Sequence, residues 1–85
     1  MTTTVYSKPA CVQCTSTYRV LDKNGIDYQT VDMSQDADAL EVMKSLGFMQ
    51  APVIVNRDEE GNIVSSWSGF NPDKIAELAE GVVAS

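Results

Sequence analysis

Two hydrophobic periods alternate along the chain, one typical of β-strands and one typical of α-helices. Short stretches rich in β-branched and aromatic residues predict strands, and stretches whose apolar residues recur every three or four positions predict helices. The predicted strands cover residues 3–7, 26–33, 52–56 and 63–68. The predicted helices cover residues 11–24, 36–46 and a segment that begins at Asn71. The elements therefore follow the order β-α-β-α-β-β-α.

The boundaries of the predicted helices carry residues that commonly begin or end a helix. Gly25 follows the first helix, and either Ser34 or Asp36 is suited to cap the second. Asn71 is expected to cap the third helix, with Pro72 at its first position. The side chains expected to face the core are Cys14, Tyr18 and Leu21 in the first helix, Leu40, Met43 and Leu46 in the second, and Ile75, Leu78 and Ala79 in the third, continued by Val82.

The order of the elements predicts one mixed sheet. The first half of the chain is a βαβ unit, whose two strands should be parallel and joined by a right-handed crossover. The second half is a hairpin that turns at Gly61 and Asn62, followed by a helix that frays at Gly81. A four-stranded sheet with helices on its faces satisfies both halves. We expect a single α/β domain over residues 1–85, because 85 residues suit one modest core.

Charge and composition exclude several classes of function. The chain carries twelve acidic and six basic residues, and the basic residues are scattered, whereas a nucleic-acid-binding surface needs a basic cluster. No apolar run approaches the roughly 20 residues that span a bilayer. The N-terminus lacks the pattern of a signal peptide, so we expect a cytoplasmic protein, in which a static structural disulfide is rare.

The only two cysteines, Cys11 and Cys14, stand three residues apart at the start of the first predicted helix. This spacing brings two thiols within disulfide range. The loop between them is too short for the bond to add much stability, so a reversible redox couple explains the spacing better. The helix start should stabilise a thiolate at Cys11, the expected nucleophile, and Cys14 lies on the apolar face, as suits a resolving thiol.

A metal site is the main alternative for the two cysteines. Zinc and iron–sulfur clusters need about four ligands, and the chain has no histidine, so a site would require two chains. A CxxC spacing without any role is a further alternative. A CxxC motif beside a βαβ unit in a cytosolic protein is otherwise typical of thioredoxin-like redox proteins.

Several residues near the cysteines admit two interpretations. Lys8 precedes Cys11 by three residues, where its ammonium would either stabilise the thiolate or remain a solvated surface charge. Pro52 opens an apolar strand, and from the pattern alone a trans peptide bond is favoured there. Trp67 and Phe70 stand at the end of the last strand, where the pattern favours packing over contact with a partner.

Three stretches together resemble the NrdH-redoxins, small proteins of the glutaredoxin and thioredoxin superfamily. They are YSKPACVQC at 6–14, QAPVI at 50–54 and WSGFNPDKI at 67–75, and the resemblance extends over about residues 3–79. It implies a thioredoxin fold with three helices and the strand order 2-1-3-4, in which the third and fourth strands run antiparallel to the first two. It also implies a cis bond between Ala51 and Pro52, close to the cysteines.

The resemblance implies a function as well. Cys11 would be the attacking and Cys14 the resolving cysteine of a dithiol–disulfide oxidoreductase. Apart from the resemblance, nothing in the sequence demands more than a monomer, and we expect no metal or cofactor. The protein would deliver electrons to the large subunit of class Ib ribonucleotide reductase and would be reduced by NADPH-dependent thioredoxin reductase. The residues that match the family's conserved active-site surroundings or contact a partner are Lys8, Gln13, Ala51, Pro52, Trp67, Ser68, Gly69 and Phe70.

Two other functions remain open. The first is a glutathione-dependent glutaredoxin. Against it, Val12 and Gln13 replace the Pro-Tyr pair typical of glutathione-using members, and residues 68–71, Ser-Gly-Phe-Asn, replace a Gly-Gly followed by acidic residues. The second is a redox-sensing interaction protein on the same fold, in which the cysteine pair is a switch. The short length and acidic charge of the chain argue against that function.

Overall fold

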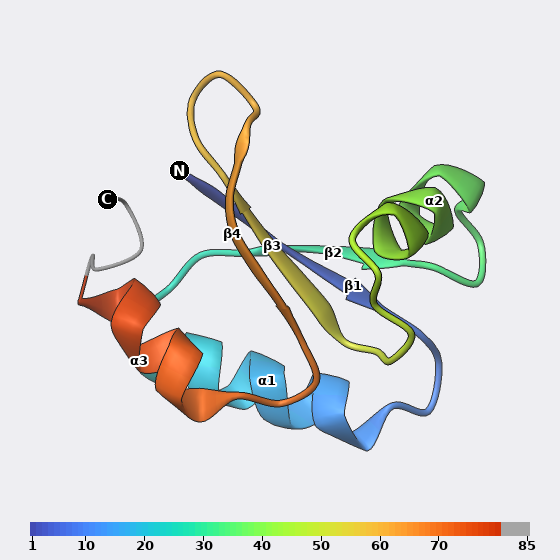
Figure 1. Cartoon of the computed structure of the whole chain (residues 1–85). Helices are drawn as coiled ribbons and strands as arrows, with labels where there is room; N and C mark the ends of the chain where they lie inside the picture. The colour runs from blue at the N-terminus through green and yellow to red at the C-terminus, as the bar shows by residue number, and fades with distance from the viewer. Residues whose placement is uncertain (81–85) are drawn as a thin grey trace.

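The computed structural model describes residues 1–80, whose elements follow the predicted order (Figure 1). The strands are β1 (Thr2–Ser7), β2 (Gln29–Asp32), β3 (Val53–Arg57) and β4 (Ile63–Ser68). The helices are α1 (Val12–Lys23), α2 (Ala37–Ser45) and α3 (Pro72–Ala79). No helix in residues 1–80 is long and apolar enough to cross a membrane. The predictions for Gly81 and Val82 lie outside the described residues.

The four strands form one sheet in the order β2-β1-β3-β4, which confirms the implied topology. β1 is parallel to β2, and β3 is antiparallel to both of its neighbours, β1 and β4. The expectation that the third and fourth strands both oppose the first two is therefore wrong for β4. Because the chain direction reverses at each of two antiparallel pairings, β4 runs in the same direction as β1 and β2.

Helices α1 and α3 lie together on one face of the sheet (Figure 1). Val5, Ile54 and Trp67 are register partners across β1, β3 and β4, and they pack against Leu21 of α1 and Ile75 of α3. Four of these five side chains are fully buried and Trp67 is 7% exposed. This cluster holds α1, the helix that begins at the cysteine pair, against the sheet.

Helix α2 covers the other face, where its fully buried residue is Ala39. The predicted inward residues Leu40, Met43 and Leu46 are only partly buried. Ala39 belongs to the buried cluster on this face, and Met43 and Leu46 pack against that cluster from partly exposed positions. The buried residues on this side include Tyr6, Met33, Val53 and Val55.

Two further predictions differ from the structure. The second strand is four residues long rather than eight, because β1 offers it register partners only from Thr4 to Ser7. Ile26 and Tyr28 precede the strand and pack against the α1–α3 cluster instead of pairing. In α3, Leu78 is buried but Ala79 is exposed, since the next residue along a helix points about 100° away.

The helix caps confirm the sequence analysis. Asp36 caps α2, and its carboxylate accepts hydrogen bonds from the N–H groups of Asp38 and Ala39 at 3.0 and 3.1 Å. Ser34, the other predicted cap, instead donates to Asp32. Asn71 caps α3 by accepting the N–H of Lys74 at 3.1 Å. Backbone N–H groups of the first turn that are hydrogen-bonded in this way mark where each helix begins.

The tip of the β3–β4 hairpin is organised by Asp58. Its carboxylate accepts the N–H groups of Asn62 and Glu60, both at 2.9 Å, and its own N–H donates to the Asn62 carbonyl. The hydrogen bond from the Asn62 backbone is the largest cause that lowers the pKa of Asp58 below its ordinary value of 3.8, and the Glu60 bond adds to it. The ionised carboxylate therefore stabilises the turn.

Replacing Asp58 by alanine is expected to lower the melting temperature near neutral pH. A carboxylate with a lowered folded-state pKa stabilises the protein above its unfolded-state pKa, and this contribution is lost as the pH falls through the folded-state value. The difference from the wild type should therefore shrink at about pH 3. Thermal unfolding followed by circular dichroism at both pH values measures it, with Glu59→Ala as the matched control. An equal loss at both pH values would contradict this role of the charge.

Candidate redox site

The two cysteines form a disulfide at the beginning of α1. Cys11 is the N-cap of the helix, and its Cα atom lies 5.2 Å from that of Cys14. Cys14 is 3% exposed, whereas Cys11 is only half-buried. The prediction that Cys14 is the more buried of the two is confirmed. A thiol from outside reaches the sulfur of Cys11 more readily than that of Cys14.

Because Cys11 is at the N-cap, a backbone N–H group of the helix points at its sulfur atom. The Cys14 N–H donates to Cys11 Sγ at 3.1 Å, the contact that a serine or aspartate oxygen commonly makes at an N-cap. When the disulfide is reduced, this N–H and the positive end of the helix dipole are placed to stabilise a thiolate. The local geometry therefore makes the two sulfur atoms chemically unequal.

The loop that precedes β3 lies beside the disulfide. The Ala51–Pro52 peptide bond is cis, as the resemblance implied, and the trans bond favoured by the pattern alone is wrong. Ala51 is buried in the same cluster as Cys14, and Cys11 packs against that cluster. The loop before β3 and the cysteine pair are thus packed against each other.

The segment 67–70 is fastened to this loop by two hydrogen bonds. Gly69 N–H donates to the Pro52 carbonyl at 2.8 Å, and Ser68 Oγ donates to the Gln50 carbonyl at 2.7 Å. The first bond extends the β3–β4 ladder beyond the register pair of Val53 and Ser68. The end of β4 is therefore held next to the cis-proline loop.

Gln13, inside the CxxC motif, joins the helix to both of these segments. Its side-chain oxygen accepts the Phe70 N–H at 3.0 Å and the Gln50 Nε2 group at 3.2 Å. Sequence analysis singled out Gln13 and Phe70 but missed Gln50. Neither the residue type of Gln50 nor its place in the sequence distinguishes it from an ordinary surface glutamine.

The other residues singled out from the sequence lie in different surroundings. Lys8 is exposed, and the salt bridge recorded in residues 1–80 joins Lys74 to Glu77, so Lys8 has no carboxylate partner there. Trp67 is 7% exposed and belongs to the core, and its indole N–H has no hydrogen-bond partner among the described residues. Phe70, by contrast, is 39% exposed beside the disulfide segment.

An apolar groove of about 360 Å³ begins next to the cis-proline loop. Its lining consists of Lys8, Met33, Ser34, Leu40, Met43, Met49 and Ala51. Three of the chain's four methionines thus line one groove, and Met49 is 95% exposed. Methionine is flexible and polarisable, and it adapts to partners of varied shape. With the exposed Val12 and Phe70, this groove makes the surroundings of the disulfide apolar.

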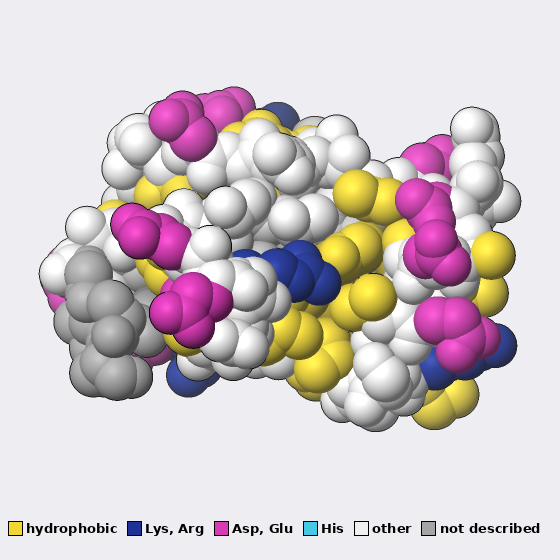
Figure 2. Space-filling view, turned by 90° about the horizontal axis from the view of Figure 1, so that it is seen from above, with side chains coloured by type: hydrophobic (Ala, Val, Ile, Leu, Met, Phe, Trp, Pro, Cys, Tyr) yellow, Lys and Arg dark blue, Asp and Glu magenta, His cyan; other side chains and the backbone are white. Residues whose placement is uncertain are grey.

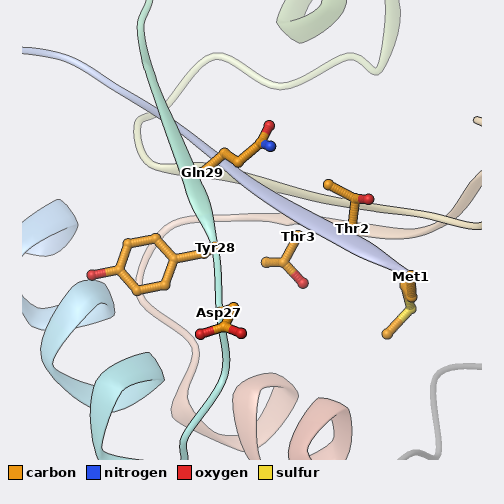
Figure 3. Close-up of a pocket in the computed structure, with 6 residues that line it drawn as sticks. All are labelled: Met1, Thr2, Thr3, Asp27, Tyr28 and Gln29. Carbon is orange, nitrogen blue, oxygen red and sulfur yellow. The ribbon is translucent and has the colours of Figure 1, made fainter.

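A second depression, of about 240 Å³, lies at the opposite end of the sheet, where β1 begins (Figure 3). Its lining consists of Met1, Thr2, Thr3, Asp27, Tyr28 and Gln29. Figure 3 shows that these side chains point in different directions, with Tyr28 turned toward the helices. Because no reactive group is present and the polar groups do not converge, this depression has no feature of a catalytic site.

In the face shown in Figure 2, separate acidic side chains stand on both sides of a hollow that contains hydrophobic side chains and a Lys or Arg side chain. The Lys and Arg side chains visible there do not form a cluster. In residues 1–80, no group of three or more His, Cys, Asp or Glu side chains is arranged to hold a metal ion. The disulfide and its apolar surroundings are therefore the part of the described chain with the clearest chemistry.

Gly69 provides a test of the contacts around Gln13. Its φ is +83°, and an added Cβ atom would lie 3.3 Å from the Gln13 side-chain oxygen and 3.6 Å from Gln50 Nε2. Gly69→Ala is expected to destabilise the protein by about 1–2 kcal/mol, the cost of a left-handed conformation, and to slow disulfide reduction because Gln13 is displaced.

Gly25→Ala is the matched control, because Gly25 also has a positive φ, +68°, but an added Cβ would meet nothing within 4 Å. Equilibrium unfolding in urea measures the stability of both variants, and reduction of a disulfide substrate measures their activity. Equal activity at matched stability would show that the Gln13 contacts do not matter for turnover.

The profile of the glutaredoxin family matches residues 3–60. The glutaredoxin-like protein NrdH of Escherichia coli K12 is 36% identical over 78 residues, which cover 92% of this chain and 89% of the relative. The NrdH protein of Lactococcus lactis is 33% identical over 76 residues, which cover 89% of this chain and 97% of the relative.

Two solved structures are similar to this chain. The NrdH-redoxin of Escherichia coli superimposes with a TM-score of 0.80 at 36% identity, over 92% of this chain and 95% of that one. A thioredoxin of Malassezia sympodialis, at 16% identity and a TM-score of 0.70, shares the fold. Sequence, fold and the CxxC disulfide agree, and the chain therefore belongs to the glutaredoxin family of thiol–disulfide oxidoreductases, among its NrdH-like members.

Proposed function

We propose that this protein is a dithiol electron carrier that reduces the large subunit of class Ib ribonucleotide reductase and is itself reduced by thioredoxin reductase. The observation that carries the proposal is the asymmetry of the cysteine pair. Cys11 Sγ is accessible at a helix N-terminus and accepts the Cys14 N–H at 3.1 Å, while Cys14 is buried behind it. An attacking thiol that a partner can reach, with a protected resolving thiol behind it, is what disulfide exchange requires.

The reaction begins with both cysteines reduced. The Cys11 thiolate attacks one sulfur of a partner disulfide, which forms a mixed disulfide and releases the other partner sulfur as a thiolate that takes up a proton. Cys14 then loses its proton and attacks Cys11 Sγ, which forms the Cys11–Cys14 disulfide and releases the second partner thiol. Two electrons pass to the partner, and two electrons from a reductase restore the dithiol.

The surroundings of the disulfide support a protein as the partner. In this proposal an extended chain of the partner lies alongside the backbone around Ala51 and Pro52, as in other strand-pairing interactions. The methionine-lined groove offers an apolar contact next to it. In this proposal the partner-contacting and site-shaping residues are Lys8, Gln13, Ala51, Pro52, Trp67, Ser68, Gly69 and Phe70, with Trp67 acting through packing beneath the segment.

The identity of the partners rests on the relatives. The relatives in Escherichia coli and Lactococcus lactis carry the name NrdH, and the Escherichia coli NrdH-redoxin is described as having a thioredoxin-like activity profile. An activity of that kind favours thioredoxin reductase as the electron source for this chain. A cytoplasmic location fits the proposal, because thioredoxin systems keep thiols reduced in that compartment.

The test is a reconstituted reaction. Class Ib ribonucleotide reductase is supplied with a ribonucleotide substrate, NADPH and thioredoxin reductase, and this protein is the only dithiol donor. Formation of deoxyribonucleotide should increase with the concentration of the protein and stop when thioredoxin reductase is omitted. Binding to the large subunit without deoxyribonucleotide formation would instead favour the redox-sensing interaction protein and overturn the proposal.

A further inference from the structure

Met49 is a large apolar side chain that the fold leaves in solvent. It is 95% exposed, although the loop that carries it, between α2 and β3, is anchored on both sides of it. Ala51 is buried in the cluster beneath α2, and Phe48 packs against the same cluster. Between them, the Gln50 carbonyl accepts the Ser68 hydroxyl at 2.7 Å. Met49 is therefore held out from an anchored loop, where its side chain adds little to the stability of the fold.

The four methionines of the chain differ in how far solvent reaches them. Met33 is 9% exposed and Met43 is partly buried, whereas Met1 and Met49 are 54% and 95% exposed. Met1 lines the depression at the far end of the sheet, and Met49 lines the groove beside the cis-proline loop. Of the three methionines in that groove, Met49 alone is mostly in solvent.

A methionine in solvent is open to oxidation by hydrogen peroxide. The thioether sulfur attacks one peroxide oxygen, so that an S–O bond forms and the O–O bond breaks. The other oxygen leaves with both electrons of that bond and takes up the proton of the new S–OH group as water. The sulfur has then lost two electrons and is a sulfoxide. In the disulfide form, Cys11 and Cys14 have no free thiol to compete for the peroxide.

We propose that Met49 is an oxidation site, at which conversion to the sulfoxide by peroxide weakens the docking of thioredoxin reductase on the methionine-lined groove. The sulfoxide is polar, and it replaces a thioether among lining residues that are mainly apolar. Burying it against a partner without a new hydrogen bond costs binding free energy. The proposal rests on the proposed function, in which this groove contacts the reductase.

The reductase is the partner for which this effect matters most. It acts on the disulfide form, which is the form that the structure describes and in which Met49 stands in solvent. Peroxide that has oxidised the cysteine pair would then also slow the return of the pair to the dithiol. The thioether is restored by a methionine sulfoxide reductase, which uses two electrons from thiols and releases the oxygen as water.

The test measures reduction of this protein by NADPH and thioredoxin reductase, before and after its disulfide form is treated with hydrogen peroxide. Mass spectrometry of proteolytic fragments should show the sulfoxide at Met49 before it appears at Met33 or Met43. KM for this protein should rise about two-fold to about thirty-fold, the range expected for burying a polar group that is partly compensated. Because only docking is affected, kcat should change little.

Two variants separate Met49 from the other methionines, and each is compared with its own untreated form. Met49→Leu has no sulfur at this position while Met1 still oxidises, so peroxide should leave its KM unchanged. Met49→Gln is polar and does not react with peroxide, so its untreated KM should already exceed that of Met49→Leu and should not rise further. Methionine sulfoxide reductase should return the KM of the oxidised wild type to its untreated value.

Each outcome bears on a different statement. An equal rise of KM in Met49→Leu would assign the effect to another residue and overturn the inference. An unchanged KM in the wild type after full conversion of Met49, or a fall in kcat alone, would overturn it as well, and both results would leave the proposed function intact. Failure of thioredoxin reductase to reduce the untreated wild type would overturn the proposed function, and the inference with it.

Discussion

Replacing Cys11 by serine is expected to abolish the reduction of disulfide substrates. A serine hydroxyl is almost fully protonated at neutral pH and does not attack a disulfide, while Cys14, at 3% exposure, cannot reach one outside the protein. The rate of NADPH oxidation in a coupled assay should fall to that measured without the protein. This is the largest effect that the account predicts for a single substitution.

The control for Cys11→Ser is the reduced wild-type protein, because both lack the disulfide. Their melting temperatures should agree closely, because neither protein contains the bond and the two differ only in one atom of one side chain. A Cys11→Ser protein that is folded and still reduces disulfides would show that Cys14 is the nucleophile. The interpretation of Cys11 as an N-cap thiolate would then be wrong.

Replacing Cys14 by serine is expected to stop turnover at a different step. Cys11 remains able to attack, so the mixed disulfide with the partner forms, but no resolving thiol is present to release the product. The amount of covalent complex should increase in proportion to the amount of partner added. Electrophoresis without reductant and intact-mass measurement both detect this complex, and a reductant should cleave its disulfide and separate the two proteins.

The matched control for Cys14→Ser is the double variant Cys11→Ser/Cys14→Ser, which should capture no partner. Capture by Cys11→Ser in place of Cys14→Ser would reverse the two roles. Capture by neither single variant would mean that the pair does not exchange with the partner through a mixed disulfide. The two substitutions together therefore assign the attacking and resolving sulfur atoms independently.

Local sequence signals predicted the parts of the fold that depend on neighbouring residues. The caps of α2 and α3 at Asp36 and Asn71 follow from side chains that reach their own first turns. The place of Cys11 at the start of α1 follows in the same way, and with it the difference in burial between the two cysteines. These features need no knowledge of what packs against each helix.

Features that depend on distant contacts escaped prediction. The length of β2 is set by how much of β1 is available for pairing, and the burial of Ala39 rather than Leu40 depends on how closely α2 approaches the sheet. The bonds of Gln13 reach residues 37 and 57 positions away, so no periodicity could indicate them. The cis bond before Pro52 was expected from the resemblance and not from the pattern.

The most direct test of the account is NADPH oxidation coupled to disulfide reduction by the wild-type protein, run with two reducing systems. One contains thioredoxin reductase, and the other contains glutathione with glutathione reductase. Turnover is expected with thioredoxin reductase, and a rate little above background is expected with glutathione. Turnover only with glutathione would contradict it, because the Cys11–Cys14 couple would then be that of a glutathione-dependent glutaredoxin.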